Sequence, residues 1–135
     1  MERYDYRQAV RDDVREWIEE DMQYRGYETF EEYARAVTDA EEDEDVDEDA
    51  VCEELGMLMW CADSVTGNAS GSYTFSSWEA EENLCHNFDL LKEACEDFCC
   101  EVRDMPESAE AMDVTIRCYL LGEAVSDVVE EFMQQ

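Results

Sequence analysis

The sequence predicts an all-α protein, a single compact bundle of five or six helices with an acidic loop and a Gly/Ser-rich connection. Apolar residues recur at helical spacing along most of the chain, and its one proline, Pro106, lies near a predicted boundary. Hydrophobic residues make up 45% of the sequence and aromatic residues 11%, enough to build a core. With 135 residues and no internal repeat or long linker, residues 1–135 are expected to form one domain.

The first two helices are predicted from periodicity and a capping pattern. The first runs from Asp5 to about Tyr24, and its apolar residues at helical spacing are Tyr6, Val10, Val14, Trp17 and Ile18. Gly26 breaks this pattern. Thr29 then suits an N-cap, because Glu32 follows three residues later and completes a capping box. The short helix that it opens is expected to bury Phe30, Tyr33, Ala34 and Val37.

The third predicted helix follows an acidic run and covers about Glu48 to Cys61. The last carboxylates of the run fall in its first turn, where the helix macrodipole favours negative charge. The side chains expected on one side of it are Val51, Leu55, Leu58 and Met59. The stretch "DSVTGNASGSYTFSS" that comes next predicts an irregular connection, with a short extended piece at "SYTF".

The last third of the chain is predicted to be helical again. Ser76 and Glu79 form a second capping box, which opens a helix with Trp78, Leu84 and Cys85. An interruption is expected at His86-Asn87, and the apolar stripe then continues through Phe88, Leu91, Cys95, Phe98 and Cys99. The final helix, about Glu107 to Met133, is expected to bury Val114, Cys118, Leu121, Val125, Val128 and Phe132.

The charge of the chain indicates what kind of partner it binds. The net charge is -30, with 39 acidic residues against nine basic ones. A net charge of about 2 to 8 is enough for colloidal stability, and a larger one destabilises the fold through self-repulsion. A polyanion does not bind nucleic acid or an anionic membrane, but it is attracted to basic surfaces, above all those that hold nucleic acid. A salt-adapted or simply acidic cytosolic protein is the alternative interpretation.

The candidate contact is the segment "TDAEEDEDVDEDA", which carries nine carboxylates between residues 39 and 49. The predicted partner-binding residues in it are Asp39, Glu41, Glu42, Asp43, Glu44, Asp45, Asp47, Glu48 and Asp49. A secondary acidic patch is predicted at Glu79, Glu81 and Glu82. The loop "SVTGNASGSY" is a further candidate contact, since loops on a rigid scaffold often carry recognition.

Four arginines stand out in this acidic chain, because they lie four residues apart on one face of the first predicted helix. They are Arg3, Arg7, Arg11 and Arg15. Like charges at this spacing are mildly unfavourable in an isolated helix. We therefore expect them to pair with an acidic surface of the same chain, for which the 39–49 run is the candidate. A functional basic ridge is the alternative.

Two patterns could indicate metal binding. Asp43, Asp45, Asp47, Asp49 and Glu54 fall at the first, third, fifth, seventh and last positions of an EF-hand loop. The sixth position should be glycine, and here it is Glu48, so no specific calcium site is predicted, although weak nonspecific divalent binding stays open. The seven cysteines form no C-x-x-C pair, and those on predicted helices have core-like spacing. They are expected to be free and mostly buried, and no metal or cofactor is predicted.

Signatures of catalysis, secretion and membrane insertion are missing from the sequence. It contains no G-x-S-x-G, no Gly-rich phosphate loop and no H-E-x-x-H, and its single histidine, His86, suits a helix boundary. No apolar run approaches the ~18 residues that a membrane span needs, and the N-terminus has no apolar signal region. We therefore predict a non-enzymatic, cytoplasmic protein.

The block "DSVTGNASGSYTFSSWEAEENLCHNFDLLKEA", together with "DVTIRCYLLGEAV" nearer the C-terminus, resembles a group of short acidic proteins of phages and integrative elements of gut Firmicutes. The similar part covers about Asp63 to Val125. Some small acidic proteins of that setting are anti-CRISPR inhibitors of the type II effector nuclease. Together with the acidic charge, the resemblance implies a DNA mimic that binds this nuclease in a bacterial host cell and blocks PAM binding. It carries over no catalytic residues. An inhibitor of a restriction enzyme, an acidic chaperone of another basic protein and a divalent-metal-binding protein are the alternatives.

Overall fold

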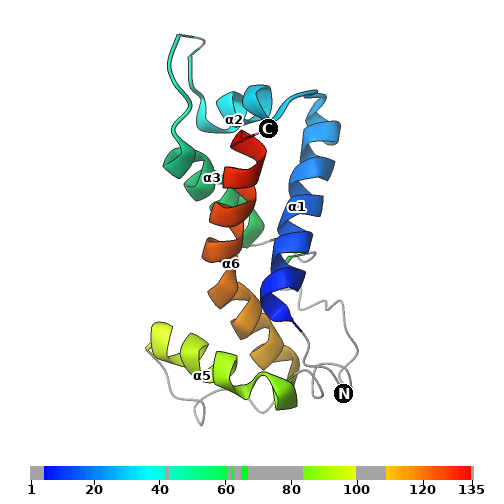
Figure 1. Ribbon diagram of the computed structural model, residues 1–135, viewed down its shortest axis with the longest axis vertical. Helices are drawn as coiled ribbons and strands as arrows, with labels where there is room; N and C mark the ends of the chain where they lie inside the picture. Colours follow the sequence, from blue (N-terminus) through cyan, green and yellow to red (C-terminus); the bar gives the residue numbers. More distant parts are fainter. Residues whose placement is uncertain are drawn as a thin grey trace.

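The structure, a computed structural model, describes residues 5–41, 43–60, 62, 65–66, 84–99 and 109–134. Regular structure within these ranges is entirely helical. The helices are α1 (Tyr6–Arg25), α2 (Phe30–Thr38), α3 (Glu48–Trp60), α5 (Phe88–Asp97) and α6 (Ala109–Met133), and they pack together as Figure 1 shows. The predicted all-α fold class is confirmed.

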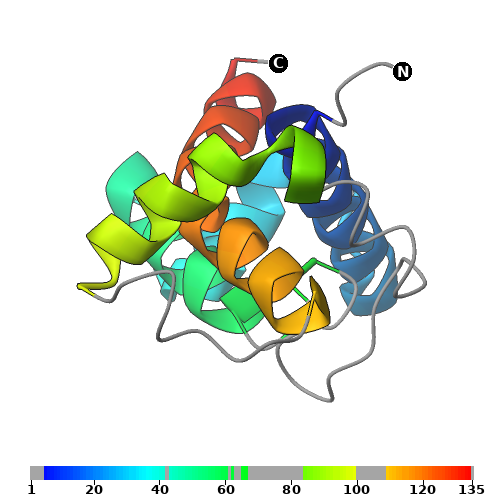
Figure 2. The ribbon, with the colours of Figure 1, turned by 90° about the horizontal axis from the view of Figure 1, so that it is seen from below.

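Helix α6 is the centre of the bundle and contacts each of the other four helices. It lies beside α1, and the two helices run in the same direction (Figure 1). Helix α3 packs on α6, and α5 crosses it near its N-terminal end, as the view from below in Figure 2 shows. The short helix α2 covers the opposite end, close to the C-terminus of the chain.

Local capping interactions fix where the first helices begin and end. The side chain of Asp5 accepts a hydrogen bond from the Gln8 amide, and Gly26 ends α1 in the left-handed conformation at φ 81°. Thr29 Oγ1 accepts from the Glu32 amide at 3.2 Å, which confirms Thr29 as the N-cap of α2. Asp39, at φ 56°, ends α2 and turns the chain into the acidic run.

The core contains the predicted inner faces of the helices with some exceptions. In α3, Val51, Leu55 and Met59 are fully buried, whereas Leu58 is 44% exposed. A step of four residues stays on the face that packs against α6, and Leu58 lies one position away from it. Trp17, Val37, Val114 and Phe132, predicted as core residues, are only partly buried.

Helix α5 faces the core with a different set of side chains from the predicted stripe. Leu90, Leu91, Ala94 and Cys95 are buried. The predicted members that are not buried are Phe88 at 48% exposure, Phe98 at 41% and Cys99. The buried residues occupy the middle of α5, whereas Phe88 is its first residue and Phe98 directly follows its last one, so both phenylalanines stand at its ends.

A buried polar network joins α1 to α6, and the sequence pattern did not predict it. The Tyr6 hydroxyl donates a hydrogen bond to Asp113 Oδ1, and Arg117 Nε donates to Asp113 Oδ2 at 3.0 Å. Arg117 Nη1 also donates to Asp13 Oδ2 at 3.3 Å. Among the described residues, every buried side-chain nitrogen and oxygen has a hydrogen-bond partner, so the buried charges are compensated.

Candidate functional site

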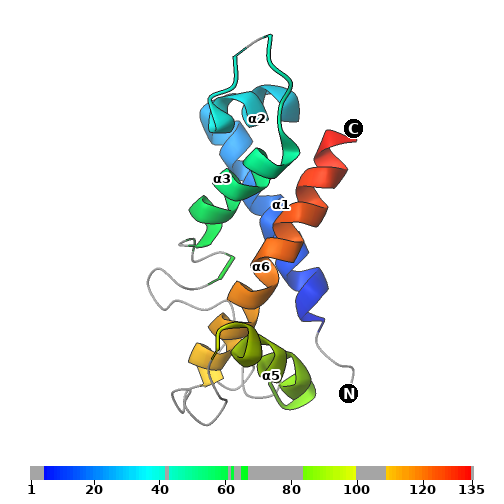
Figure 3. The same ribbon diagram turned by 90° about the vertical axis from the view of Figure 1, so that its left-hand side faces the viewer.

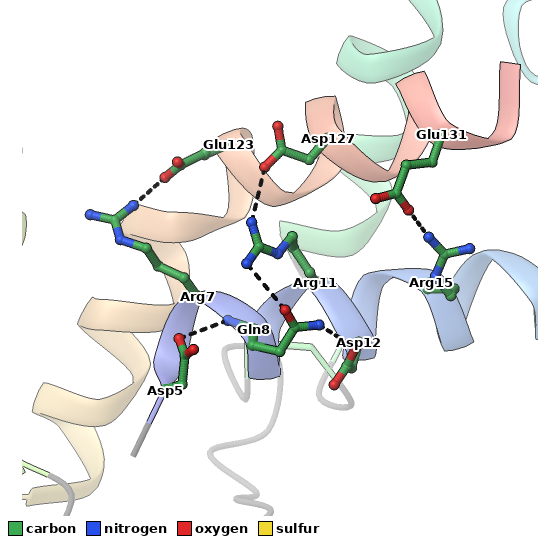
Figure 4. Close-up of polar contacts among 9 residues, drawn as sticks. All are labelled: Asp5, Arg7, Gln8, Arg11, Asp12, Arg15, Glu123, Asp127 and Glu131. Carbon is green, nitrogen blue, oxygen red and sulfur yellow. Dashed lines mark hydrogen bonds and ion pairs between the residues drawn. The ribbon is translucent and has the colours of Figure 1, made fainter. Parts of the chain in front are cut away.

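Three arginines of α1 pair with acidic residues of α6 at the same four-residue spacing. Figure 4 shows the pairs Arg7–Glu123, Arg11–Asp127 and Arg15–Glu131, with Arg11 Nη1 3.4 Å from Asp127 Oδ2. Because the two helices run parallel, each step of one turn along α1 meets an equal step along α6. Intramolecular pairing of these three arginines is confirmed, and the 39–49 run is wrong as their partner. Arg3 lies outside the described residues.

The other described arginines are also used within the chain. Arg25 pairs with Asp21 at 3.0 Å, Arg35 pairs with Glu31 at 3.3 Å, and Arg117 belongs to the buried network. Each described arginine is therefore neutralised by a carboxylate of its own protein. The Nζ atom of Lys92 lies 5.2 Å from the centre of the Phe88 ring. Because the six described arginines are paired within the chain, the charge that the described residues present outward is mostly negative.

The acidic run forms a loop between α2 and α3 that projects beyond α2 at one end of the molecule (Figures 1 and 3). Its backbone is held from below by Arg35, whose Nη1 donates to the carbonyl oxygens of Glu41 at 2.8 Å and Glu44 at 2.7 Å. The Glu44 amide also donates to the Glu41 carbonyl, which closes a turn. Val46, partly buried, packs against the core. These contacts hold the loop backbone and involve none of its carboxylate groups.

The described carboxylates of this loop are all exposed. They are Asp39, Glu41, Asp43, Glu44, Asp45, Asp47, Glu48 and Asp49. Glu42 lies outside the described residues. Within the part of the chain that the structure describes, none of these carboxylates forms an ion pair with a basic side chain. The loop is thus a dense set of like charges without internal neutralisation.

Asp47 differs from its neighbours because it also caps a helix. It directly precedes α3, and its Oδ1 atom accepts a hydrogen bond from the Asp49 amide at 3.1 Å. Its carbonyl oxygen accepts from the Val51 amide at 3.1 Å. Asp47 therefore stabilises the start of α3 in addition to contributing charge.

The geometry of the run does not suit an EF-hand. Helix α3 begins at Glu48, the position where an EF-hand loop needs a sharp turn, so Asp49 and Glu54 already lie on the helix. Among the residues that the structure describes, no group of three or more His, Cys, Asp or Glu side chains is placed to hold a metal ion.

The other predicted contacts lie mostly outside the described residues. Glu79, Glu81 and Glu82 belong to this group, as does most of the "SVTGNASGSY" loop. The described part of that loop is Val65 and Thr66, and both are fully buried. These two residues hold the chain against the core and are wrong as members of a recognition loop.

The five described cysteines are less buried than predicted. Cys95 and Cys118 are buried and Cys52 is partly buried, but Cys85 and Cys99 are exposed, as is His86. Burial raises the pKa of the Cys118 thiol to about 11. The pKa of Cys52 is also raised, by burial and then by the charges of Glu48 and Asp49. Both thiols are therefore protonated at neutral pH and lack nucleophilic character.

In the described residues no helix has the length and apolar character needed to span a membrane. No protein-family model matches the chain, and no curated protein and no solved structure matches it either.

Proposed function

We propose that this protein is a nucleic-acid mimic that inhibits a host defence nuclease by occupying its DNA-binding surface. The proposed target is the type II CRISPR effector, at the site where it reads the PAM. The observation that supports this proposal most is the acidic loop between α2 and α3. Its described carboxylates are exposed and form no ion pair with a described basic side chain, and Arg35 holds its backbone.

The proposed recognition depends on charge density. Double-stranded DNA carries one negative charge per ~1.7 Å of its axis, and nucleases meet it with lysine and arginine. PAM-reading arginines make bidentate contacts, and a carboxylate can accept the same fork of N–H donors. Repulsion among the loop carboxylates would be relieved in a basic cleft, which adds to the driving force for binding. Inhibition of this kind requires no catalysis by the protein.

The test reverses the charge of the loop while keeping the helix cap. In a first variant, Glu41, Asp43, Glu44 and Asp45 are replaced by lysine and Asp47 is retained. Binding of target DNA by the guide-loaded effector is measured as each protein is added. The wild type should prevent DNA binding, less effectively at high salt, and the reversed variant should not. Inhibition that survives the reversal would show that the loop is not the contact.

A matched control separates the loop from overall net charge. Four exposed acidic residues of α1, namely Asp12, Glu16, Glu19 and Glu20, are replaced by lysine, which changes the net charge by the same amount. This control should keep most of its inhibition if the loop is the contact. Equal loss in both variants would favour a diffuse charge effect. Pull-down from a host lysate, with and without competitor DNA, would identify a restriction enzyme or another basic protein if the CRISPR effector is not the target.

A further inference from the structure

Helices α3 and α6 and the C-terminal end of α5 border an open groove of about 600 Å³. It is lined chiefly by apolar groups, among them Gly56, Met57, Trp60, Phe98, Tyr119 and Gly122. Met57 is 65% exposed, Trp60 42% and Phe98 41%, so three large side chains gather around one groove. Exposed apolar groups clustered in this way are typical of an interaction site.

Two glycines keep this groove open. Gly56 lies on α3 and Gly122 on α6, and a Cβ atom built at either position has no atom within 4 Å. Glycine inside a helix makes the helix less stable than alanine would. A larger residue would fit at both positions, so the glycines leave space in the groove that a group from another molecule can occupy. The Cys52 and Cys118 thiols also line the groove, and their raised pKa values keep them neutral.

The rim of the groove is acidic and continuous with the acidic loop. Glu53 and Asp97 line it, and no described basic side chain does. On α3, Asp49, Glu53 and Gly56 follow each other at spacings of four and three residues, so they lie on one face of the helix. One side of α3 therefore leads from the end of the acidic loop into the groove.

We infer that this groove binds an apolar side chain of an amphipathic, lysine- or arginine-rich segment of a partner protein. The inference rests on the proposed function, because the same basic partner would contact the acidic loop. Apolar lining with an acidic rim complements a segment whose hydrophobic face is bordered by cations. A second copy of this chain suits the groove poorly, because it would bring together two rims of the same charge and two chains of net charge -30.

Two dye-labelled synthetic peptides of equal positive charge test the inference by fluorescence anisotropy. One is an amphipathic helix with leucines on one face and lysines on the other, and the second is an oligolysine without apolar residues. The full-length wild type should bind the amphipathic peptide more tightly, with the difference persisting at high salt. Gly122→Leu fills the groove, and Met57→Ser removes an exposed apolar side chain. Each should weaken binding of the amphipathic peptide by roughly tenfold and leave oligolysine binding unchanged.

A control and the loop variant distinguish the possible outcomes. Gln23→Leu adds a leucine to the exposed surface of α1, away from the groove, and should change neither affinity. The four-lysine loop variant should weaken binding of both peptides. If both groove variants bind the amphipathic peptide as the wild type does, the inference is wrong while the role of the loop stands. Self-association of the wild type that Gly122→Leu abolishes would instead identify the occupant as a second copy.

Discussion

Arg117 Nε lies 3.0 Å from Asp113 Oδ2 on the face of α6 that packs against α1, and both side chains are almost completely buried. The second carboxylate oxygen of Asp113 accepts from the Tyr6 hydroxyl, and the Arg117 guanidinium lies 5.6 Å from the centre of the Tyr6 ring. Charge, hydrogen bonds and aromatic packing are thus concentrated at one level of the bundle. This network fixes the position of α1 along the axis of α6.

Replacing Arg117 by methionine should destabilise the fold strongly. The substitution keeps much of the side-chain volume but leaves the Asp113 carboxylate buried without its cation. Breaking a buried pair in this way costs about 3–5 kcal/mol. Urea unfolding followed by circular dichroism measures the loss. Arg11→Ala, which removes a half-exposed ion pair, is the control and should cost about 0.2–1 kcal/mol. Equal losses in both variants would contradict a special role for the buried pair.

Asp13 should make the stability depend on pH. Burial raises its pKa from 3.8 to about 6, helped by the charges of Glu16 and Asp12 and opposed by Arg117. Between these two values the native state binds more protons at Asp13 than the unfolded state does, so its contribution to the free energy of unfolding falls as pH rises. Asp13→Asn removes this contribution.

The measurement compares wild type and Asp13→Asn in urea from about pH 4 to about pH 7. The variant should gain stability relative to the wild type as pH rises through this range, with no further change above it. Parallel stability curves for the two proteins would show that Asp13 titrates with its ordinary pKa.

The sequence predicted the helices well, because periodicity and capping are local properties of the chain. The predicted bounds of the first, third and last helices differ by at most two residues from those of α1, α3 and α6. The predicted burial of some side chains was wrong. Leu58 and Phe88 were expected to lie in the core, and both are exposed. The part of a helix that its neighbours cover depends on where the helices cross. The crossing points are set by contacts between residues that are far apart in the sequence.

The exposure of the acidic loop could be predicted from the sequence, but the partners of the arginines on α1 could not. A run of like charges that cannot be neutralised locally has to lie in solvent, so the exposure of Asp43 or Asp45 follows from composition. The partners of the α1 arginines could not be predicted in this way. Arg11 and Asp127 are 116 residues apart, and only the parallel packing of α1 and α6 brings them together. The groove near Gly56 and Gly122 also depends on packing, although an exposed glycine within a helical pattern is a signal that could have indicated it.

A charge swap tests the three ion pairs between α1 and α6. Arg11→Glu places two carboxylates next to each other, and Asp127→Arg places two guanidinium groups next to each other, so each should be less stable than the wild type. The double variant restores the pair in reverse. A double-mutant cycle should give a coupling of about 0.2–1 kcal/mol that decreases with salt. Additive losses in the cycle would show that the pair contributes nothing in solution.

Asp45 and Asp47 lie two residues apart and carry the same charge, yet only the replacement of Asp47 by alanine should lower the stability of the fold. Asp47→Ala removes the acceptor of the Asp49 amide at the start of α3 and should cost about 0.5–2 kcal/mol. Asp45→Ala removes only a repelling charge and should be neutral or slightly stabilising. Asp47→Asn keeps the cap and should behave like Asp45→Ala. Thermal unfolding of the three variants measures this ranking, and a loss at Asp45 equal to that at Asp47 would contradict it. Since each variant lacks one negative charge, all three should bind oligolysine equally, which separates the structural role of Asp47 from its charge.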